Sequence, residues 1–248
     1  MKHMTAVVRK RKVGLEEALE FQKKLNEESI VVTLGDKLPP NTDRVIALGG
    51  DGTALAVAKE YPNHPIMSVN YGHLGFLSAL NKDDDPNGEF KTIERITLKN
   101  SFCDYLALNE IVIARGSIPR SVKMAVYIDD ILLSKYSADG IIISTPTGST
   151  AYNLSAHGPI ISNDVDCIII TPICPHFNKN NSVVVGMNSV VRIKLLSNTK
   201  TFITIDGQIT KSLNPGQEIS ISLSDKRIKF LYDKNYNFIS RISEGYKK

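Results

Sequence analysis

A glycine turn between a strand pattern and a helix pattern restricts the possible fold more than any other feature of this chain. The apolar run Asp43–Leu48 predicts a buried strand, and the alanine-rich run Thr53–Glu60 predicts a helix. Only Gly49-Gly50-Asp51-Gly52 lies between them. A buried strand that turns so tightly into a helix is typical of α/β domains.

The alternation of strands and helices covers the first part of the chain. Strand patterns occur at Thr5–Arg9, Ser29–Leu34 and Pro65–Asn70, and Gly14–Glu28 carries apolar residues at helical spacing. This order predicts a mainly parallel sheet with right-handed crossovers. We therefore expect a Rossmann-like α/β domain at residues 1–95.

After about residue 95 the pattern changes to short strands separated by turn signals. Such spacing predicts an all-β layered, sandwich-like domain, which we place at residues 96–234. The final segment, about 235–248, is a candidate to pack back on the α/β domain. The expected strands are Leu106–Ala114, Val122–Ile128, Ile131–Tyr136, Gly140–Ser144, Cys167–Thr171, Ser182–Val185, Val190–Leu196, Thr201–Ile205, Glu218–Leu223 and Ile228–Tyr232.

Composition excludes several classes of function. The net charge is +4, and the basic residues are scattered, so the chain suits an anionic substrate and gives no sign of nucleic-acid binding. No apolar run is long enough for a membrane helix, and Met1–Val8 lacks the apolar region that is typical of a signal peptide. Three unpaired cysteines are typical of reduced, mostly buried thiols, and we expect a cytoplasmic protein. The acidic run within Asn81–Gly88 is interpreted as a surface loop and not as a metal site.

The glycine turn also predicts chemistry. A helix N-terminus carries unpaired N–H groups and partial positive charge, and glycine lets a phosphate approach the backbone closely. Asp51 would repel that phosphate unless it binds a metal or acts as a base, and both roles occur in phosphoryl transfer. The turn alone also fits a simple tight turn, and it matches neither a Walker loop nor the dinucleotide fingerprint.

The GGDGT sequence at Gly49–Thr53 resembles the loop of NAD kinases, of diacylglycerol and sphingosine kinases and, in variant form, of phosphofructokinases. Other segments narrow the resemblance to the NAD kinase family, because they occur in that family's order over most of the chain. These segments are Asn70–Leu77 (NYGHLGFL), Leu106–Glu110 (LALNE), Asp139–Pro159 (DGIIISTPTGSTAYNLSAHGP), Thr171–His176 (TPICPH) and Ile205–Gln208 (IDGQ).

The resemblance implies a role for individual residues. Asp51 matches a catalytic base that takes the proton of the ribose 2′-hydroxyl, and Gly49, Gly50, Gly52 and Thr53 match residues that line the phosphoryl donor. Phe76 matches an aromatic residue that packs on adenine, although core packing remains open for it. The remaining implied NAD-binding residues are Asp51, Gly52, Asn109, Glu110, Arg120, Asp139, Thr147, Thr150, Ala151, Tyr152, Asn153, Leu154, Ser155, Cys174, Asp206 and Gln208.

Some of these matches have simpler explanations, and the chain departs from the family in two places. Asp206 with Gly207 also fits a hairpin turn, and Arg120 also fits an ordinary surface residue. His157 stands where the family usually has glycine, and we interpret it as a packed or half-exposed side chain. The stretch 81–100 is short and suggests a missing helix.

The resemblance implies an enzyme that forms NADP from NAD. ATP or polyphosphate would supply the phosphoryl group. A divalent metal ion, which we expect to be Mg²⁺, would assist the transfer, and no side chain is assigned as its ligand. NAD would bind in the crevice between the two halves, in a homodimer or homotetramer without nucleic acid or membrane. Two alternatives stay open at this point: a lipid or sphingoid-base kinase that shares GGDGT, and a non-catalytic NADP(H)-binding regulator.

Overall fold

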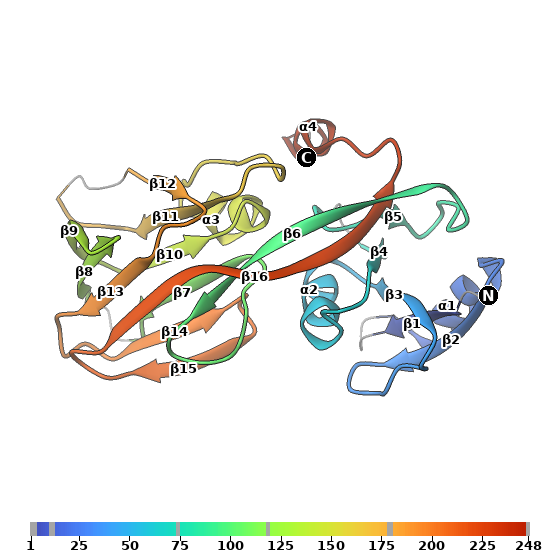
Figure 1. Ribbon diagram of the computed structural model, residues 1–248, viewed down its shortest axis with the longest axis horizontal. Helices are drawn as coiled ribbons and strands as arrows, with labels where there is room; N and C mark the ends of the chain where they lie inside the picture. The colour runs from blue at the N-terminus through green and yellow to red at the C-terminus, as the bar shows by residue number, and fades with distance from the viewer. Residues whose placement is uncertain (1–3, 10–12, 73–74, 118–119, 178–180, 247–248) are drawn as a thin grey trace. The chain divides into compact units, whose positions relative to one another are not determined.

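The structure is a computed structural model that describes residues 4–9, 13–72, 75–117, 120–177 and 181–246. Its contacts divide the chain into two compact units, residues 1–95 with 228–248 (unit 1) and residues 96–227 (unit 2). Two long strands, β6 (Phe90–Asn100) and β16 (Glu218–Asp233), run from one unit into the other and pair with each other (Figure 1).

Unit 1 is built on a parallel sheet in the order β2-β1-β3-β4. The second half of β16 extends this sheet, with Phe230 opposite Ile66 of β4, and short β5 pairs with the same strand. The elements are β1 (Met4–Arg9), α1 (Leu15–Lys24), β2 (Glu28–Thr33), β3 (Thr42–Leu48), α2 (Asp51–Glu60), β4 (Ile66–Asn70), β5 (Leu80–Asn81) and α4 (Phe238–Tyr246).

The core of unit 1 follows from the position of these strands. Every residue of β4 is buried, as expected for a parallel strand covered on both faces. Val7, Ile46 and Met67 form one apolar cluster with Ala18 and Phe21 of α1. The α/β prediction for this part of the chain is confirmed.

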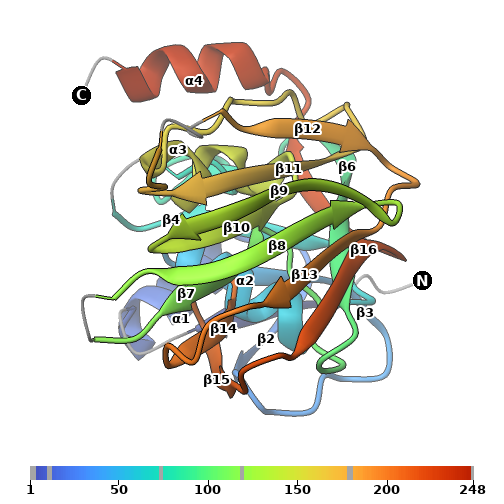
Figure 2. The ribbon, with the colours of Figure 1, turned by 90° about the vertical axis from the view of Figure 1, so that its left-hand side faces the viewer.

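Unit 2 contains two layers of antiparallel strands. Figure 2 looks onto the layer formed by β9, β8, β13 and the first half of β16. The second layer has the order β12-β11-β10-β7-β14-β15. The elements are β7 (Glu110–Arg115), β8 (Val122–Ile128), β9 (Ile131–Ala138), β10 (Gly140–Ser144), the 3₁₀ helix η1 (Thr147–Thr150), α3 (Tyr152–Ser155), β11 (Cys167–Ile173), β12 (Val183–Gly186), β13 (Val191–Leu195), β14 (Thr201–Ile205) and β15 (Ile209–Leu213).

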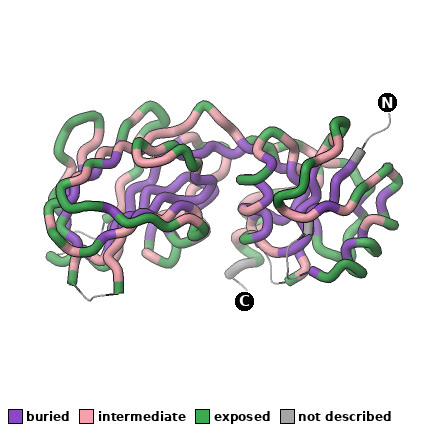
Figure 3. The backbone as a smooth tube through the Cα atoms, turned by 90° about the horizontal axis from the view of Figure 1, so that it is seen from below, coloured by how far each residue is buried: buried purple, intermediate pink, exposed green. Residues whose placement is uncertain are grey.

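Alternate residues of the two layers form one core in unit 2. Ile111 and Ile113 of β7 join Met124 and Val126 of β8 and Ile193 of β13 in a single apolar cluster. This is the two-residue period of strands that have one buried face. Figure 3 shows buried backbone along the strands and exposed backbone in the loops. The layered all-β prediction is confirmed for this unit.

The structure corrects several local predictions. The prediction of two separate strands at Glu218–Leu223 and Ile228–Tyr232 is wrong, because β16 is continuous over both. It pairs with β6, and the Thr97 hydroxyl donates to the main-chain oxygen of Lys226 at 2.6 Å. The α1 prediction was too long, because the helix ends at Lys24. In the stretch 81–100, which we interpreted as lacking a helix, residues 90–100 form strand β6. All three cysteines are free thiols, but of these only Cys167 is buried.

Candidate active site

The glycine turn of unit 1 is shaped by contacts with the helix that it opens. Gly49 has φ +148°, and a Cβ there would collide with the side chain of Thr53. Gly50 is the N-cap of α2 and, as a glycine, has no side chain that could cap the helix. The backbone N–H groups of the first turn give this end of the helix a partial positive charge.

Gly50 and Gly52 differ from Gly49, because a Cβ on either would meet nothing within 4 Å. The packing of the described chain therefore does not require glycine at these two positions. The open space at these positions would allow a phosphate to approach the backbone closely. Turn and helix together have the local structure of a phosphate cradle.

Asp51, the first residue of α2, lies beside the segment 75–78. Its Oδ2 accepts a hydrogen bond from the main-chain N–H of Phe76 at 2.8 Å, and its Oδ1 accepts one from Leu77 at 3.1 Å. A Cβ on Gly75 would collide with Oδ1, so that glycine is needed for this approach. Burial raises the pKa of Asp51, while the two N–H groups and the charge of Arg241 lower it.

Phe76 is thus linked to Asp51 through its backbone, and its own side chain is half-buried. That degree of exposure leaves ring surface for a ligand. His73 and Leu74 of the same motif lie outside the described residues.

In unit 2, Asp206 holds the backbone at Asn109-Glu110. Asp206 has φ +49° in the β14–β15 hairpin, as the hairpin interpretation predicted. Its carboxylate accepts hydrogen bonds from the main-chain N–H groups of Leu108 (2.9 Å), Asn109 (2.7 Å) and Glu110 (3.1 Å). The turn residue therefore also fixes the start of β7.

Glu110 of unit 2 has a buried carboxyl group with a strongly raised pKa. Its side chain is buried, and within the described chain its Oε2 has no hydrogen-bond partner. Burial, and secondly the charge of Asp206, raise the pKa of Glu110 to about 8. A carboxyl group of this kind is mostly protonated at neutral pH and can donate a hydrogen bond.

The hydroxyl-rich turn after β10 is bound to the same backbone. The Thr145 hydroxyl donates to the main-chain oxygen of Leu108 at 2.6 Å, and the Ser144 hydroxyl donates to that of Asn109 at 3.2 Å. A Cβ on Gly148 would collide with the main-chain oxygen of Asn109. The turn after β10 and the Asn-Glu pair thus form one structural cluster.

Asn153 of α3 is fully buried and is bonded on both sides of its amide. Its Nδ2 donates to the main-chain oxygens of Ser149 and Pro159, and its Oδ1 accepts from the Thr171 hydroxyl at 2.7 Å. A Cβ on Gly158 would collide with this side chain. The Asn153 side chain therefore holds α3 to β11.

The other predicted binding residues differ in exposure. Asp139 forms a two-point ion pair with Arg115, at 2.7 and 3.2 Å. Thr53 and Thr147 are buried, and Thr150 and Ala151 are half-buried. The remaining predicted side chains are exposed, namely those of Arg120, Tyr152, Leu154, Ser155, Cys174 and Gln208. Exposed His157 has φ +61°, in the left-handed region that favours glycine.

The described residues do not fit a preassembled metal centre. No group of three or more His, Cys, Asp or Glu side chains among them is arranged to hold a metal ion. Asp51 offers one carboxylate, whose two oxygens already accept N–H groups. Since Mg²⁺ often binds through one or two carboxylates and substrate phosphates, a metal would need the donor to complete its ligands.

Several residues at these sites were missed from the sequence. Gly75 lies inside a recognised motif, so that closer attention to the motif could have found it. Arg115 and Arg241 lie outside every motif, and only the folded chain brings them to Asp139 and to the Asp51 segment.

Fold and site define a class of two-unit kinases, in which an α/β unit carries the glycine loop and a β-sheet unit follows. Two family models cover the chain: the ATP-NAD kinase N-terminal domain matches residues 4–100, and the ATP-NAD kinase C-terminal domain matches residues 108–232. The chain belongs to the NAD kinase family.

Relatives and solved structures agree with that assignment. An NAD kinase of Clostridium botulinum (strain ATCC 19397) is 39% identical, covering 83% of this chain and 79% of its own, and one of Clostridium beijerinckii is 35% identical, covering 88% and 84%. The yeast NADH kinase complexed with NADH superposes with TM-score 0.85 at 27% identity, covering 98% and 86%. An Archaeoglobus fulgidus NAD kinase in complex with ATP gives TM-score 0.83 at 25% identity, covering 98% of both chains.

Proposed function

We propose that this protein transfers a phosphoryl group from ATP to the 2′-hydroxyl of the adenosine ribose of NAD, giving NADP and ADP. Asp51 is the base. The observation that carries the proposal is the half-buried Asp51 carboxylate at the N-terminus of α2, held by two main-chain N–H groups beside two glycines that the described packing does not require. Relatives named NAD kinase, and a relative solved with ATP, support donor and acceptor.

Asp51 is prepared for this role by its hydrogen bonds. The N–H groups of Phe76 and Leu77 fix the plane of the carboxylate and favour its ionised form. Burial opposes ionisation and makes the carboxylate a stronger base. In the reaction, Asp51 takes the 2′-hydroxyl proton, the oxygen bonds to the terminal phosphorus, and the bond from that phosphorus to its bridging oxygen breaks.

The other parts of the proposal are distributed over both units. Gly49, Gly50, Gly52 and Thr53 line the donor phosphates, and backbone N–H groups of α2 offset their charge. Phe76 packs on adenine, and the cluster around Asn109, Glu110 and the turn after β10 binds NAD. Mg²⁺ would arrive with the donor and supply charge neutralisation.

Three further properties of this protein are proposed from the family alone. These are polyphosphate as a second donor, assembly as a homodimer or homotetramer, and a cytoplasmic location. No helix within the described residues is long and apolar enough to cross a membrane.

The test is formation of NADP from NAD with ATP and Mg²⁺, compared between the wild type and Asp51→Asn. Removal of a general base should lower kcat by roughly 10²–10⁴-fold. Asp83→Asn, at an exposed carboxylate of the 81–88 loop, is the matched control and should leave kcat unchanged. A folded Asp51→Asn enzyme with wild-type kcat would refute the role of Asp51. Tight NADP binding without turnover in the wild type would favour the regulator, and turnover of diacylglycerol would favour the lipid kinase.

A further inference from the structure

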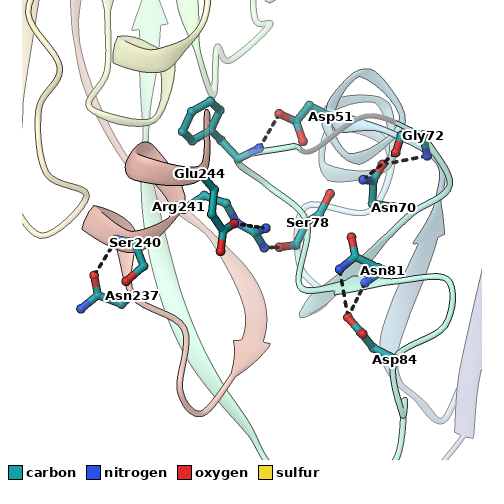
Figure 4. A network of polar contacts seen from close by, with 11 residues as sticks. Asp51, Asn70, Gly72, Ser78, Asn81, Asp84, Asn237, Ser240, Arg241 and Glu244 are labelled. Carbon is teal, nitrogen blue, oxygen red and sulfur yellow. Dashed lines mark hydrogen bonds and ion pairs between the residues drawn. The ribbon is translucent and has the colours of Figure 1, made fainter. Parts of the chain in front are cut away.

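Helix α4, near the end of the chain, contributes one arginine to the Asp51 segment of unit 1. The Arg241 guanidinium donates through one nitrogen to the main-chain oxygen of Ser78 at 3.2 Å (Figure 4). A second nitrogen lies 3.4 Å from Glu244 of the same helix. The Arg241 side chain is only 14% exposed, whereas that of Glu244 is 55% exposed. The arginine is therefore anchored on the inner side, and its acidic partner faces solvent.

The segment that Arg241 holds is the one that holds Asp51. Phe76 and Leu77 donate their N–H groups to the carboxylate, and Ser78, the next residue, accepts from Arg241. The buried Ser78 hydroxyl has no partner among the described residues. A Cβ on Gly75 would come within 2.8 Å of that hydroxyl and would also collide with Asp51 Oδ1. Carboxylate, hydroxyl and guanidinium thus surround one short stretch of backbone.

The charged groups around Asp51 come from three elements. Arg241 of α4 lowers the pKa of Asp51 through its charge. Tyr232 of β16, whose pKa is raised to about 12 chiefly by burial, is also influenced by Asp51. Arg95 of β6 is 2% exposed and donates to the Tyr232 hydroxyl at 2.8 Å. With Tyr232 neutral and Arg95 bound to it, Arg241 is the cation that acts on Asp51 most directly.

We propose that Arg241 is a positioning residue of the phosphoryl transfer: it holds the segment 75–78 against Asp51. This inference rests on the proposed function of Asp51. Helix α4 thereby supports the position of Asp51 at the glycine turn, although most of the sequence separates α4 from that turn.

The role predicts a specific kinetic pattern. Without Arg241 the two N–H donors are less firmly placed, so the carboxylate loses orientation in the transition state and kcat falls. Because the positive charge is also lost, the Asp51 pKa rises, and the acidic limb of the kcat/KM profile moves to higher pH. A helix that only stabilised the fold would lower the amount of folded enzyme and leave that limb in place.

The experiment compares Arg241→Met and Arg241→Lys with the wild type over a range of pH. Arg241→Met should lose roughly tenfold or more in kcat, with little change in the KM of ATP, and its acidic limb should shift upward. Arg241→Lys keeps the positive charge but lacks the planar guanidinium group. The acidic limb of its kcat/KM profile should therefore stay near that of the wild type, while part of kcat is lost. Arg192→Met is the matched control, because Arg192 pairs with Asp130 and Glu218 of unit 2, and it should change neither quantity.

A second readout separates this inference from the proposed function. The carboxyl carbon of Asp51, assigned by its loss in Asp51→Asn, can be titrated by ¹³C NMR without turnover. A wild type that forms no NADP but whose Asp51 titration shifts in Arg241→Met would refute the reaction and support the coupling. An active wild type whose titration and acidic limb are both unmoved in Arg241→Met would overturn the inference. A rise in the KM of ATP at unchanged kcat would also overturn it, since that result assigns Arg241 to donor binding.

Discussion

Asp206 Oδ1 lies 2.7 Å from the main-chain nitrogen of Asn109, and the same carboxylate also accepts from the residues on either side. An acidic residue at a hairpin turn thereby fixes the backbone that carries Asn109 and Glu110. The role of Asp206 as a direct NAD contact stays a prediction, but its structural role is evident from these three bonds.

Asp206→Asn should weaken both the fold and the NAD site. Asparagine tolerates the positive φ but has one acceptor oxygen in place of two, and it is uncharged. Loss of charge-assisted hydrogen bonds should lower the free energy of unfolding by about 1–3 kcal/mol and raise the KM of NAD about tenfold. Urea unfolding and steady-state kinetics measure the two effects.

Asp129 provides a matched control for this substitution. It also has positive φ in a hairpin, and its carboxylate accepts from the main-chain nitrogen of Val190 and the Ser189 hydroxyl. Asp129→Asn should therefore lower stability without changing the KM of NAD. An equal rise in that KM for both variants would contradict the assignment of Asp206.

Gly75→Ala should impair catalysis more than folding. The added methyl group would collide with Asp51 Oδ1, so the carboxylate must shift from its place at Phe76 and Leu77. Misplacement of a catalytic group by about 1 Å costs roughly 10²-fold, and we expect a loss of this size in kcat. In Gly88→Ala the new Cβ meets only a main-chain oxygen at 3.7 Å, so this control should keep wild-type activity. Equal activity of the two variants would show that Asp51 does not need its observed position.

Glu110 should make stability depend on pH in an unusual direction. Its pKa in the folded protein is about 8, above the ordinary value of 4.5, so the folded state binds more protons than the unfolded state between these values. This contribution to stability is therefore present at low pH and is lost as pH rises from about 4.5 to 8. Glu110→Gln removes the titrating group. The free energy of unfolding, measured at pH 5 and pH 8, should fall less with pH in the variant, and parallel curves would rule out the raised pKa.

His157→Gly should stabilise the protein. A non-glycine residue at φ +61° costs about 1–2 kcal/mol, and glycine recovers part of this after its own entropy cost. We expect a net gain of about 0.5–1 kcal/mol in thermal or urea unfolding. His157→Ala removes the imidazole but keeps the Cβ, so it should give no such gain. A loss of stability in both variants would instead assign a stabilising contact to the imidazole.

The candidate site was predictable to the extent that its residues are consecutive in the chain. The order of strand, glycine turn and helix placed Asp51 at a helix start, and the structure has it as the first residue of α2. Strands β8, β10 and β14 begin and end at the predicted residues, because turn signals limit these short apolar runs. By contrast, β6 and β15 were missed, because β6 mixes apolar with charged residues along its length and β15 is largely polar.

The sequence by itself determined the family, the two kinds of secondary-structure pattern and the identity of the carboxylate at the phosphate cradle, because those depend on local spacing and on motif residues. Only the tertiary structure decided how those residues are held. Asn153 is bonded to Thr171 from another element, Asp206 to the start of β7, and Arg241 to Ser78 across most of the chain. Contacts between residues so distant in sequence leave no periodic pattern, since each depends on where the packing of apolar strands brings the backbone.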